Sequence, residues 1–97
     1  MSDRSLPFAA PIPTADLAGF PDALTSVAQA RRAVEVARMP AIRSQPAWLD
    51  AYNRLTLAAA TGRLPDVEAA RIALNFAALT ERRGGRQSIR WPARIAA

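Results

Sequence analysis

Between residues 46 and 61 the large side chains recur every three or four positions, which is the spacing of a helix with one buried face. The stripe consists of Trp48, Tyr52, Leu55 and Ala59. A proline suits the first position of a helix, and a glycine commonly follows the last. Pro46 and Gly62 occupy those places, so the pattern predicts a helix from Pro46 to about Thr61.

A second helix is predicted from Pro65 to about Arg83, where Gly84-Gly85 provides a strong stop signal. Only a few residues separate it from the helix over 46–61. Two helices of this length that are joined by so short a connection are expected to form an antiparallel hairpin.

The helix over 65–83 has two apolar faces and only a narrow polar stripe. One face carries Ile72, Phe76 and Leu79, and the other carries Val67 and Leu74 with alanines beside them. The helix over 46–61 can cover one face, but the second face needs another cover. The first helix of the chain is one candidate, and a second copy or a different protein is the alternative. We therefore take Val67 and Leu74 as candidate partner-binding residues.

A further helix is predicted before the hairpin, from Pro21 to Arg38, because Pro21 and Asp22 favour a helix start and Met39-Pro40 forms a stop. Its apolar arc is made mostly of alanine, which permits close approach but offers little area. We expect this helix to pack across the hairpin. The predicted fold is all-α, with three helices in a domain over residues 21–83.

Residues 1–20 are predicted to form a proline-rich N-terminal arm. The prolines at positions 7, 11 and 13 exclude a regular helix and favour an extended chain. The arm is either a disordered start or a strap whose Phe8 and Ile12 dock on a neighbouring surface. Near its end, Thr14 favours a single helical turn over 15–18 that stops at Gly19.

Residues 84–97 are predicted to form a second, C-terminal arm with a hinge at the two glycines. Ile89 and Trp91 alternate with Arg90, which is the pattern of an extended segment with one apolar side. Ile89 and Trp91 are the candidate anchors of this arm. A solvated tail, a docking segment and a nucleic-acid-binding segment all fit its composition.

Charge is unevenly distributed along the chain. All 13 basic residues are arginine and the formal net charge is +5, of which residues 81–97 alone carry +4. Arginine binds carboxylate and phosphate in fork geometry, so the basic side chains are candidate contacts to an acidic partner. At the C-terminal end these candidates are Arg82, Arg83, Arg86, Arg90 and Arg94. Arg31 and Arg32 form a second cluster, in which Arg31 is spaced to pair with Glu35.

The residue types that usually carry catalysis are missing. The chain contains no His and no Cys, so the common ligands of zinc, copper and haem are absent, as are the usual general base and thiol nucleophile. The eight acids are scattered along the chain. We therefore expect no enzyme activity, no cofactor and no metal. No apolar run approaches the ~20 residues of a membrane span, so we expect a cytoplasmic protein.

Alanine accounts for 23 of the 97 residues, and hence for much of the 51% apolar fraction. Since hydrophobic stabilisation scales with buried area, so many alanines predict a thin core, which favours a partner or self-association. We expect a non-enzymatic adaptor, assembly or inhibitor protein that acts through protein–protein contacts. The alternative is a nucleic-acid-associated protein without sequence specificity, serving packaging or regulation as in phages and mobile elements, that uses the Arg-rich C-terminal arm.

Overall fold

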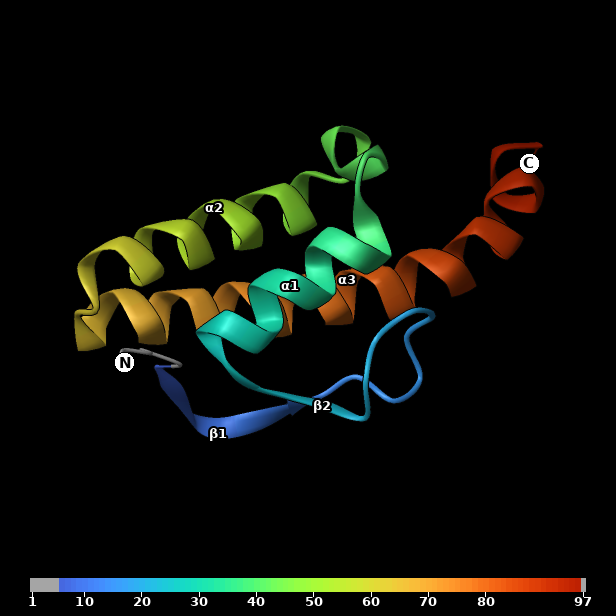
Figure 1. Cartoon of the computed structure of the whole chain (residues 1–97). Coiled ribbons are helices and arrows are strands. Elements are labelled where there is room, and N and C mark those ends of the chain that lie inside the picture. Colours follow the sequence, from blue (N-terminus) through green and yellow to red (C-terminus); the bar gives the residue numbers. More distant parts are fainter. Residues whose placement is uncertain (1–5, 97) are drawn as a thin grey trace.

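The computed structural model describes the backbone of residues 6–96 and the side chains of residues 6–83. Within this range, strands come first and helices follow (Figure 1). The elements are β1 (Pro7–Pro13), β2 (Ala23–Ser26), α1 (Val27–Arg38), the short 3-10 helix η1 (Ala41–Ser44), α2 (Pro46–Thr61) and α3 (Leu64–Ala96). The fold is mostly helical, as predicted. It also contains a small two-stranded sheet, so the expectation of a purely α-helical chain is wrong.

The predicted helical hairpin lies at the centre of the fold. α2 spans Pro46–Thr61, the bounds expected from the sequence. Gly62 follows in the left-handed region at φ 68°, and its N–H donates to the carbonyl oxygen of Ala58 at 2.8 Å. A glycine adopts this positive φ without a Cβ clash, which explains why the helix stops here. α3 then runs back along α2 in the antiparallel direction (Figure 1).

The N-terminal segment is not a free arm, because β1 pairs with β2 in an antiparallel ribbon. Ile12 lies opposite Leu24, and Pro7 lies opposite Ser26. A proline has no N–H to donate, so a strand with several prolines is confined to a sheet edge. A two-stranded ribbon consists only of edges and therefore accommodates β1.

α1 begins at Val27 and not at Pro21 as predicted. Residues 23–26 form β2. Their backbone groups pair with β1, so these residues are not available for the first turn of the helix. Ser26 then caps the helix, because its side-chain oxygen accepts a hydrogen bond from the N–H of Gln29 at 3.2 Å. Serine is among the preferred N-cap residues, and this capping fixes where the helix starts.

The loop between β1 and β2 is closed by Thr14, which is fully buried. Its N–H donates to the carbonyl oxygen of Asp22 at 2.9 Å, and its hydroxyl donates to that of Pro21 at 2.7 Å. Thr14 thus ties the two ends of the loop together, and the expected helical turn is replaced by hydrogen-bonded turns. Gly19 adopts φ 86°, and a Cβ placed on it would lie 3.0 Å from the Cβ of Ala37.

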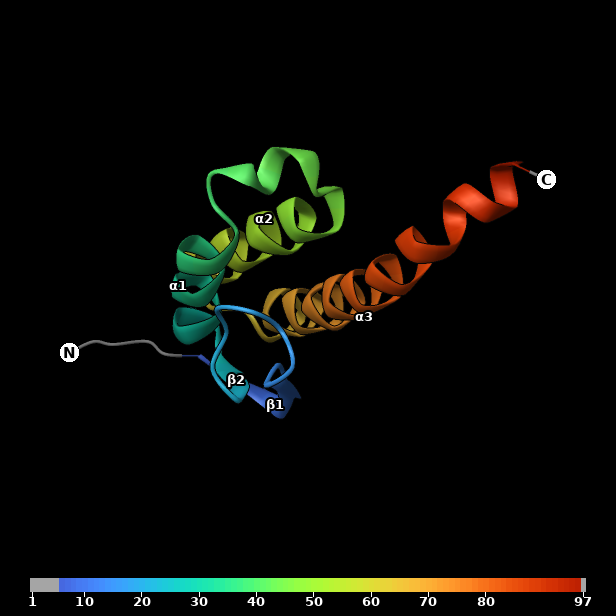
Figure 2. The same ribbon diagram turned by 90° about the vertical axis from the view of Figure 1, so that its right-hand side faces the viewer.

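The three helices and the ribbon surround one core (Figure 2). α1 packs on α2, whereas β1 packs on α3. The largest fully buried side chains come from all of these elements and include Ile12, Leu24, Val34, Leu55 and Leu74. The first helix was one candidate cover for the second face of the hairpin helix, but the N-terminal ribbon covers the α3 side instead.

α3 continues through Gly84-Gly85 to Ala96, which contradicts both the predicted stop and the extended C-terminal arm. Each glycine costs roughly 1 kcal/mol relative to alanine inside a helix. Helix growth is cooperative and adds one backbone hydrogen bond per residue, so an established helix extends through such a weak point. The C-terminal end of α3 projects beyond the other elements (Figures 1 and 2).

Candidate protein-interaction surface

One face of α3 presents three large apolar side chains to solvent. Ile72, Phe76 and Leu79 have 55%, 61% and 46% of their surface exposed. They are spaced by four and then three residues, which places them on one side of the helix. The opposite face, with Val67 and Leu74, belongs to the core. We call the three exposed residues the α3 outer face.

The prediction that Val67 and Leu74 are free to bind a partner is wrong, since they are 6% and 0% exposed. Phe8 and Ile12, the candidate anchors if the N-terminal arm were a docking strap, are likewise buried in the chain's own core, at 8% and 1%. Both findings have one cause. β1, which carries Phe8 and Ile12, packs on α3 and covers this side of the hairpin.

Polar side chains border the α3 outer face. Glu68 and Arg71 form an ion pair in which the guanidinium donates to both carboxylate oxygens. This hydrogen bonding holds the pKa of Glu68 below its ordinary value and raises the pKa of Arg71. Further along, the hydroxyl of Thr80 donates to the carbonyl oxygen of Phe76 at 2.8 Å. The α3 outer face is therefore an apolar strip with polar borders.

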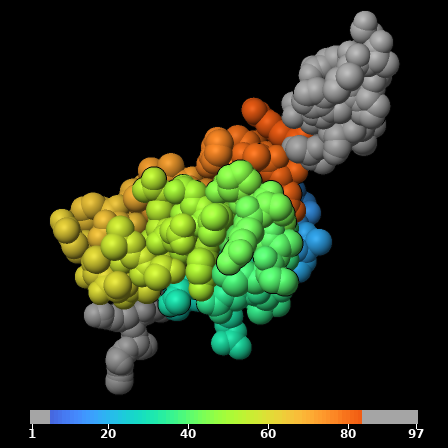
Figure 3. All heavy atoms as spheres, turned by 90° about the horizontal axis from the view of Figure 1, so that it is seen from above, coloured from blue at the N-terminus to red at the C-terminus, as the bar shows by residue number. Residues whose placement is uncertain are grey.

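A pocket of about 880 Å³ opens beside Phe76. Its walls come from the end of α1, from η1, from the start of α2 and from the middle of α3. Met39, Ala47 and Trp48 line the same pocket as Phe76 and contribute apolar surface to it. A view onto α2 shows α3, in orange, along the flank of α2 (Figure 3). The pocket thus extends the apolar surface of α3 toward α2.

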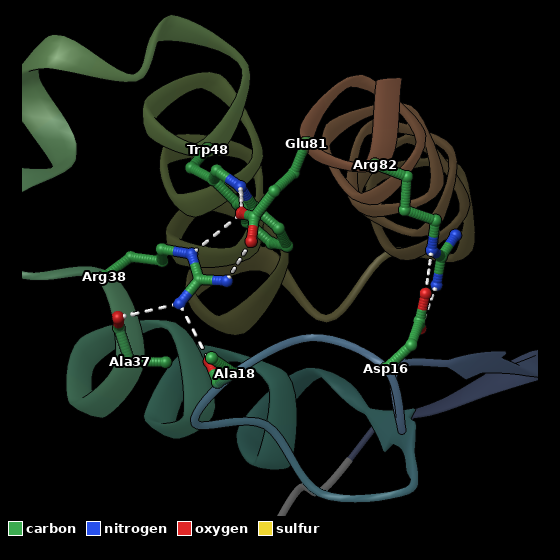
Figure 4. A network of polar contacts seen from close by, with 7 residues as sticks. All are labelled: Asp16, Ala18, Ala37, Arg38, Trp48, Glu81 and Arg82. Atoms are coloured by element: carbon green, nitrogen blue, oxygen red, sulfur yellow. Dashed lines mark hydrogen bonds and ion pairs between the residues drawn. The ribbon is translucent and has the colours of Figure 1, made fainter. Parts of the chain in front are cut away.

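The polar wall of this pocket is a network around Glu81 (Figure 4). Nε and Nη2 of Arg38 donate to Oε1 and Oε2 of Glu81 at 3.0 and 2.6 Å. Nε1 of Trp48 donates to the same Oε1 at 2.8 Å. Nη1 of Arg38 donates to the carbonyl oxygens of Ala18 at 3.0 Å and Ala37 at 2.8 Å. The Glu81 carboxylate thus joins α1, α2 and α3, and Arg38 adds the N-terminal loop to the network.

The guanidinium of Arg38 also lies over two aromatic rings, 4.8 Å from the ring centre of Phe20 and 5.4 Å from that of Trp48. The two ring centres are 5.1 Å apart. All three guanidinium nitrogens donate hydrogen bonds, and Glu81 balances the charge. The network therefore holds the fold together, and the pocket has mainly apolar contact to offer a ligand.

Arg82, predicted as a basic contact to a partner, is bound within the chain. Its Nε and Nη2 donate to Oδ2 and Oδ1 of Asp16 at 2.7 and 2.9 Å (Figure 4), and Nη2 also donates to the carbonyl oxygen of Pro13 at 2.9 Å. Hydrogen bonding by Arg82 holds the pKa of Asp16 below its ordinary value, and the carboxylate raises the pKa of Arg82. Arg82 thus fastens the N-terminal loop to α3, and its assignment as a free contact is wrong.

The two arginines of the α1 cluster have different surroundings. The guanidinium of Arg31 lies 5.8 Å from the ring centre of Tyr52, and its Nε is buried with no hydrogen-bond partner in the described part of the chain. Glu35, the predicted partner of Arg31, instead accepts a hydrogen bond from the Tyr52 hydroxyl at 2.6 Å. Arg32 is exposed, and so is Arg83 on α3.

The remaining predicted contacts lie outside the described side chains. They are Arg86, Ile89, Arg90, Trp91 and Arg94. Their backbone belongs to α3, so the alternation of Ile89 and Trp91 with Arg90 occurs in a helix and not in the extended segment that it predicted.

Among the described residues, no three acidic side chains lie close enough together to hold a metal ion. No helix in that part of the chain has the length and apolar character to cross a membrane. Comparisons with protein-family models, with curated proteins and with solved structures find no match.

Proposed function

We propose that the chain is a non-enzymatic adaptor, assembly or inhibitor protein of the cytoplasm, which binds another protein chain through the α3 outer face. The supporting observation is the exposure of Ile72, Phe76 and Leu79 on a helix whose other face already fills the core. A single exposed apolar residue is common on protein surfaces. A contiguous group at helical spacing is typical of an interaction site.

The affinity of such a surface follows from its area. Burying a fully exposed Phe, Leu or Ile side chain stabilises by about 1.5–3 kcal/mol. Since each of the three side chains is about half exposed, a partner gains roughly 1 kcal/mol from each. The pocket beside Phe76 adds apolar surface next to them. The binding free energy expected from three such side chains is small, so it favours a reversible complex over a permanent one.

Nucleic-acid binding has less support from the described residues. Phosphate recognition relies on clustered basic side chains that are free to form contacts. Arg38 and Arg82 instead donate to Glu81 and Asp16 within the chain. An apolar strip such as the α3 outer face contributes nothing to phosphate binding.

Photo-crosslinking tests the proposal directly. A benzoylphenylalanine at position 76 places a reactive aromatic group on the α3 outer face with little change in shape. We expect discrete crosslinked protein bands when this variant is irradiated in the cells that produce it. The matched control carries the same group at Val36, which is 72% exposed but lies on α1. Equal crosslinking from positions 76 and 36, or none from position 76, would contradict the proposed function.

A further inference from the structure

The α3 outer face has the spacing that two helices need in order to pack on each other. Ile72, Phe76 and Leu79 follow one another at four and three residues, and half-buried Ala69 precedes them by three. Alternation of three and four residues produces the apolar seam through which paired helices interlock. Helices that pack in this way lie about 8–10 Å apart. A second helix with the same seam would cover all three exposed side chains.

Charge is polarised along α3, and this polarity restricts the direction in which a second α3 can lie. Near its start Asp66 and Glu68 balance Arg63 and Arg71, whereas the sequence from 83 onward carries four arginines and no acid. A parallel pair would place these two basic ends side by side. An antiparallel pair places them at opposite ends of the complex, each next to the neutral start of the other helix, where Glu68 lies.

The antiparallel arrangement also gives the exposed charges partners. If Ile72 faces Phe76 of a second copy, Glu68 faces residue 80 of that copy. If Ile72 faces Leu79, then Glu68 faces residue 83. Glu68 keeps 45% of its side-chain surface exposed beside Arg71, and Arg83 is exposed as well. The second of these registers centres the pair next to Phe76 and brings Glu68 of each copy opposite Arg83 of the other.

We infer that the occupant of the α3 outer face is a second copy of this chain, packed antiparallel about a two-fold axis near Phe76. This inference rests on the proposed function, because it names the partner of the same surface. Two Phe76 rings meet near the axis, Ile72 and Leu79 pack on either side, and a Glu68–Arg83 contact closes each end. α1 packs on α2 and not along α3 (Figure 2), so the first helix leaves α3 room for a second copy.

The size of the surface indicates a weak dimer. A stable complex commonly buries about 800 Å² on each partner. The whole chain exposes 6146 Å², so a standard interface would take roughly an eighth of it. Three half-exposed side chains supply only part of that area, and the pocket rim around Met39 supplies more. We expect a dissociation constant weaker than about 1 μM.

Sedimentation velocity of the purified full chain over a range of concentrations tests the dimer. The mass should rise from monomer to dimer, and Phe76→Asp should raise the dissociation constant by about tenfold or more. Val36→Asp, on α1, should leave the equilibrium unchanged. Glu68→Arg and Arg83→Glu should each weaken the dimer, because each creates two like-charge contacts. The double variant, in which the charges are exchanged, should restore the dimer.

Disulfide trapping tests the direction of the helices. The chain has no natural Cys, so introduced thiols are the only ones present. Mixing Glu68→Cys protein with Arg83→Cys protein should give the mixed disulfide in an antiparallel dimer. Disulfides formed only between like positions would indicate a parallel pair and overturn the inference.

The failures of the two proposals are distinguishable. A chain that stays monomeric at all concentrations, yet crosslinks from position 76 to a different protein, would overturn the second copy and retain the proposed function. A monomeric chain without crosslinks from position 76 would overturn both.

Discussion

The carboxylate of Glu81 on α3 accepts two hydrogen bonds from the guanidinium of Arg38 at the end of α1, at 3.0 and 2.6 Å. α1 packs mainly on α2, so this pair is the polar link between the first and last helices. The Arg38 side chain is only 9% exposed, and its charge depends on this single carboxylate. The same carboxylate accepts the indole N–H of Trp48. A position expected to lie near a flexible hinge is thus a centre of the fold.

Glu81→Gln should destabilise the protein by about 2 kcal/mol, because it leaves the guanidinium of Arg38 in a poorly solvated site without a counter-charge. The glutamine keeps the volume, so packing changes little. Urea unfolding measures the difference. Asp50→Asn is the matched control, since it breaks an ion pair to Arg54 whose side chains are 57% and 50% exposed. That change should alter the free energy of unfolding by less than about 1 kcal/mol.

The two faces of α3 should respond differently to truncation. Leu74→Ala removes a fully buried side chain and should lower the free energy of unfolding by about 3 kcal/mol. Ile72→Ala removes an exposed side chain and should change it by no more than about 0.5 kcal/mol when the protein is dilute. Thermal and urea unfolding compare the two variants. A larger loss for Ile72→Ala than for Leu74→Ala would mean that α3 is rotated from the position described.

Gly19→Ala should destabilise the N-terminal loop. Gly19 has φ 86°, and an added Cβ would lie 3.0 Å from the Cβ of Ala37 on α1. Positive φ is unfavourable for alanine, and the contact forces the loop away from the helix. We expect a loss of about 1–2 kcal/mol, measured by urea unfolding. Unchanged stability would show that the loop does not need this conformation.

The Asp16–Arg82 pair should make stability depend on pH at acidic values. Arg82 holds the pKa of Asp16 below its ordinary value in the folded protein. A depressed carboxyl pKa stabilises the folded state at all pH values above the ordinary aspartate pKa. This stabilisation is lost as the pH falls through the lowered pKa, when the unfolded chain binds the proton first. Asp16→Asn should therefore show a shallower acid limb in a melting-temperature profile than the unmodified chain.

The regular features of the hairpin are predictable from the sequence because they are local. Pro46 and Gly62 mark both ends of α2, and the period of 3.6 residues separates the two faces of α3. Which face is buried is not a local property. It depends on β1, whose prolines favour an extended chain but do not reveal that it pairs with residues 23–26.

The network at Glu81 leaves a signal in the sequence that is visible once the buried face of α3 is known. Val67, Leu74 and Glu81 are spaced by seven residues, so all three lie on the same side of the helix. A carboxylate in a buried row requires a partner. Arg38 is 43 positions away, and only the three-dimensional packing identifies it as that partner.

We propose that the α3 outer face is the surface through which the chain associates. Methyl NMR of the purified chain in a dilution series reports on that face directly, because Ile72 and Leu79 each carry methyl groups on it, and Val36 provides a reference on α1. We predict that the Ile72 and Leu79 signals shift with concentration while the Val36 signal stays constant. Constant Ile72 and Leu79 signals over a concentration range in which the mass of the protein doubles would contradict the account.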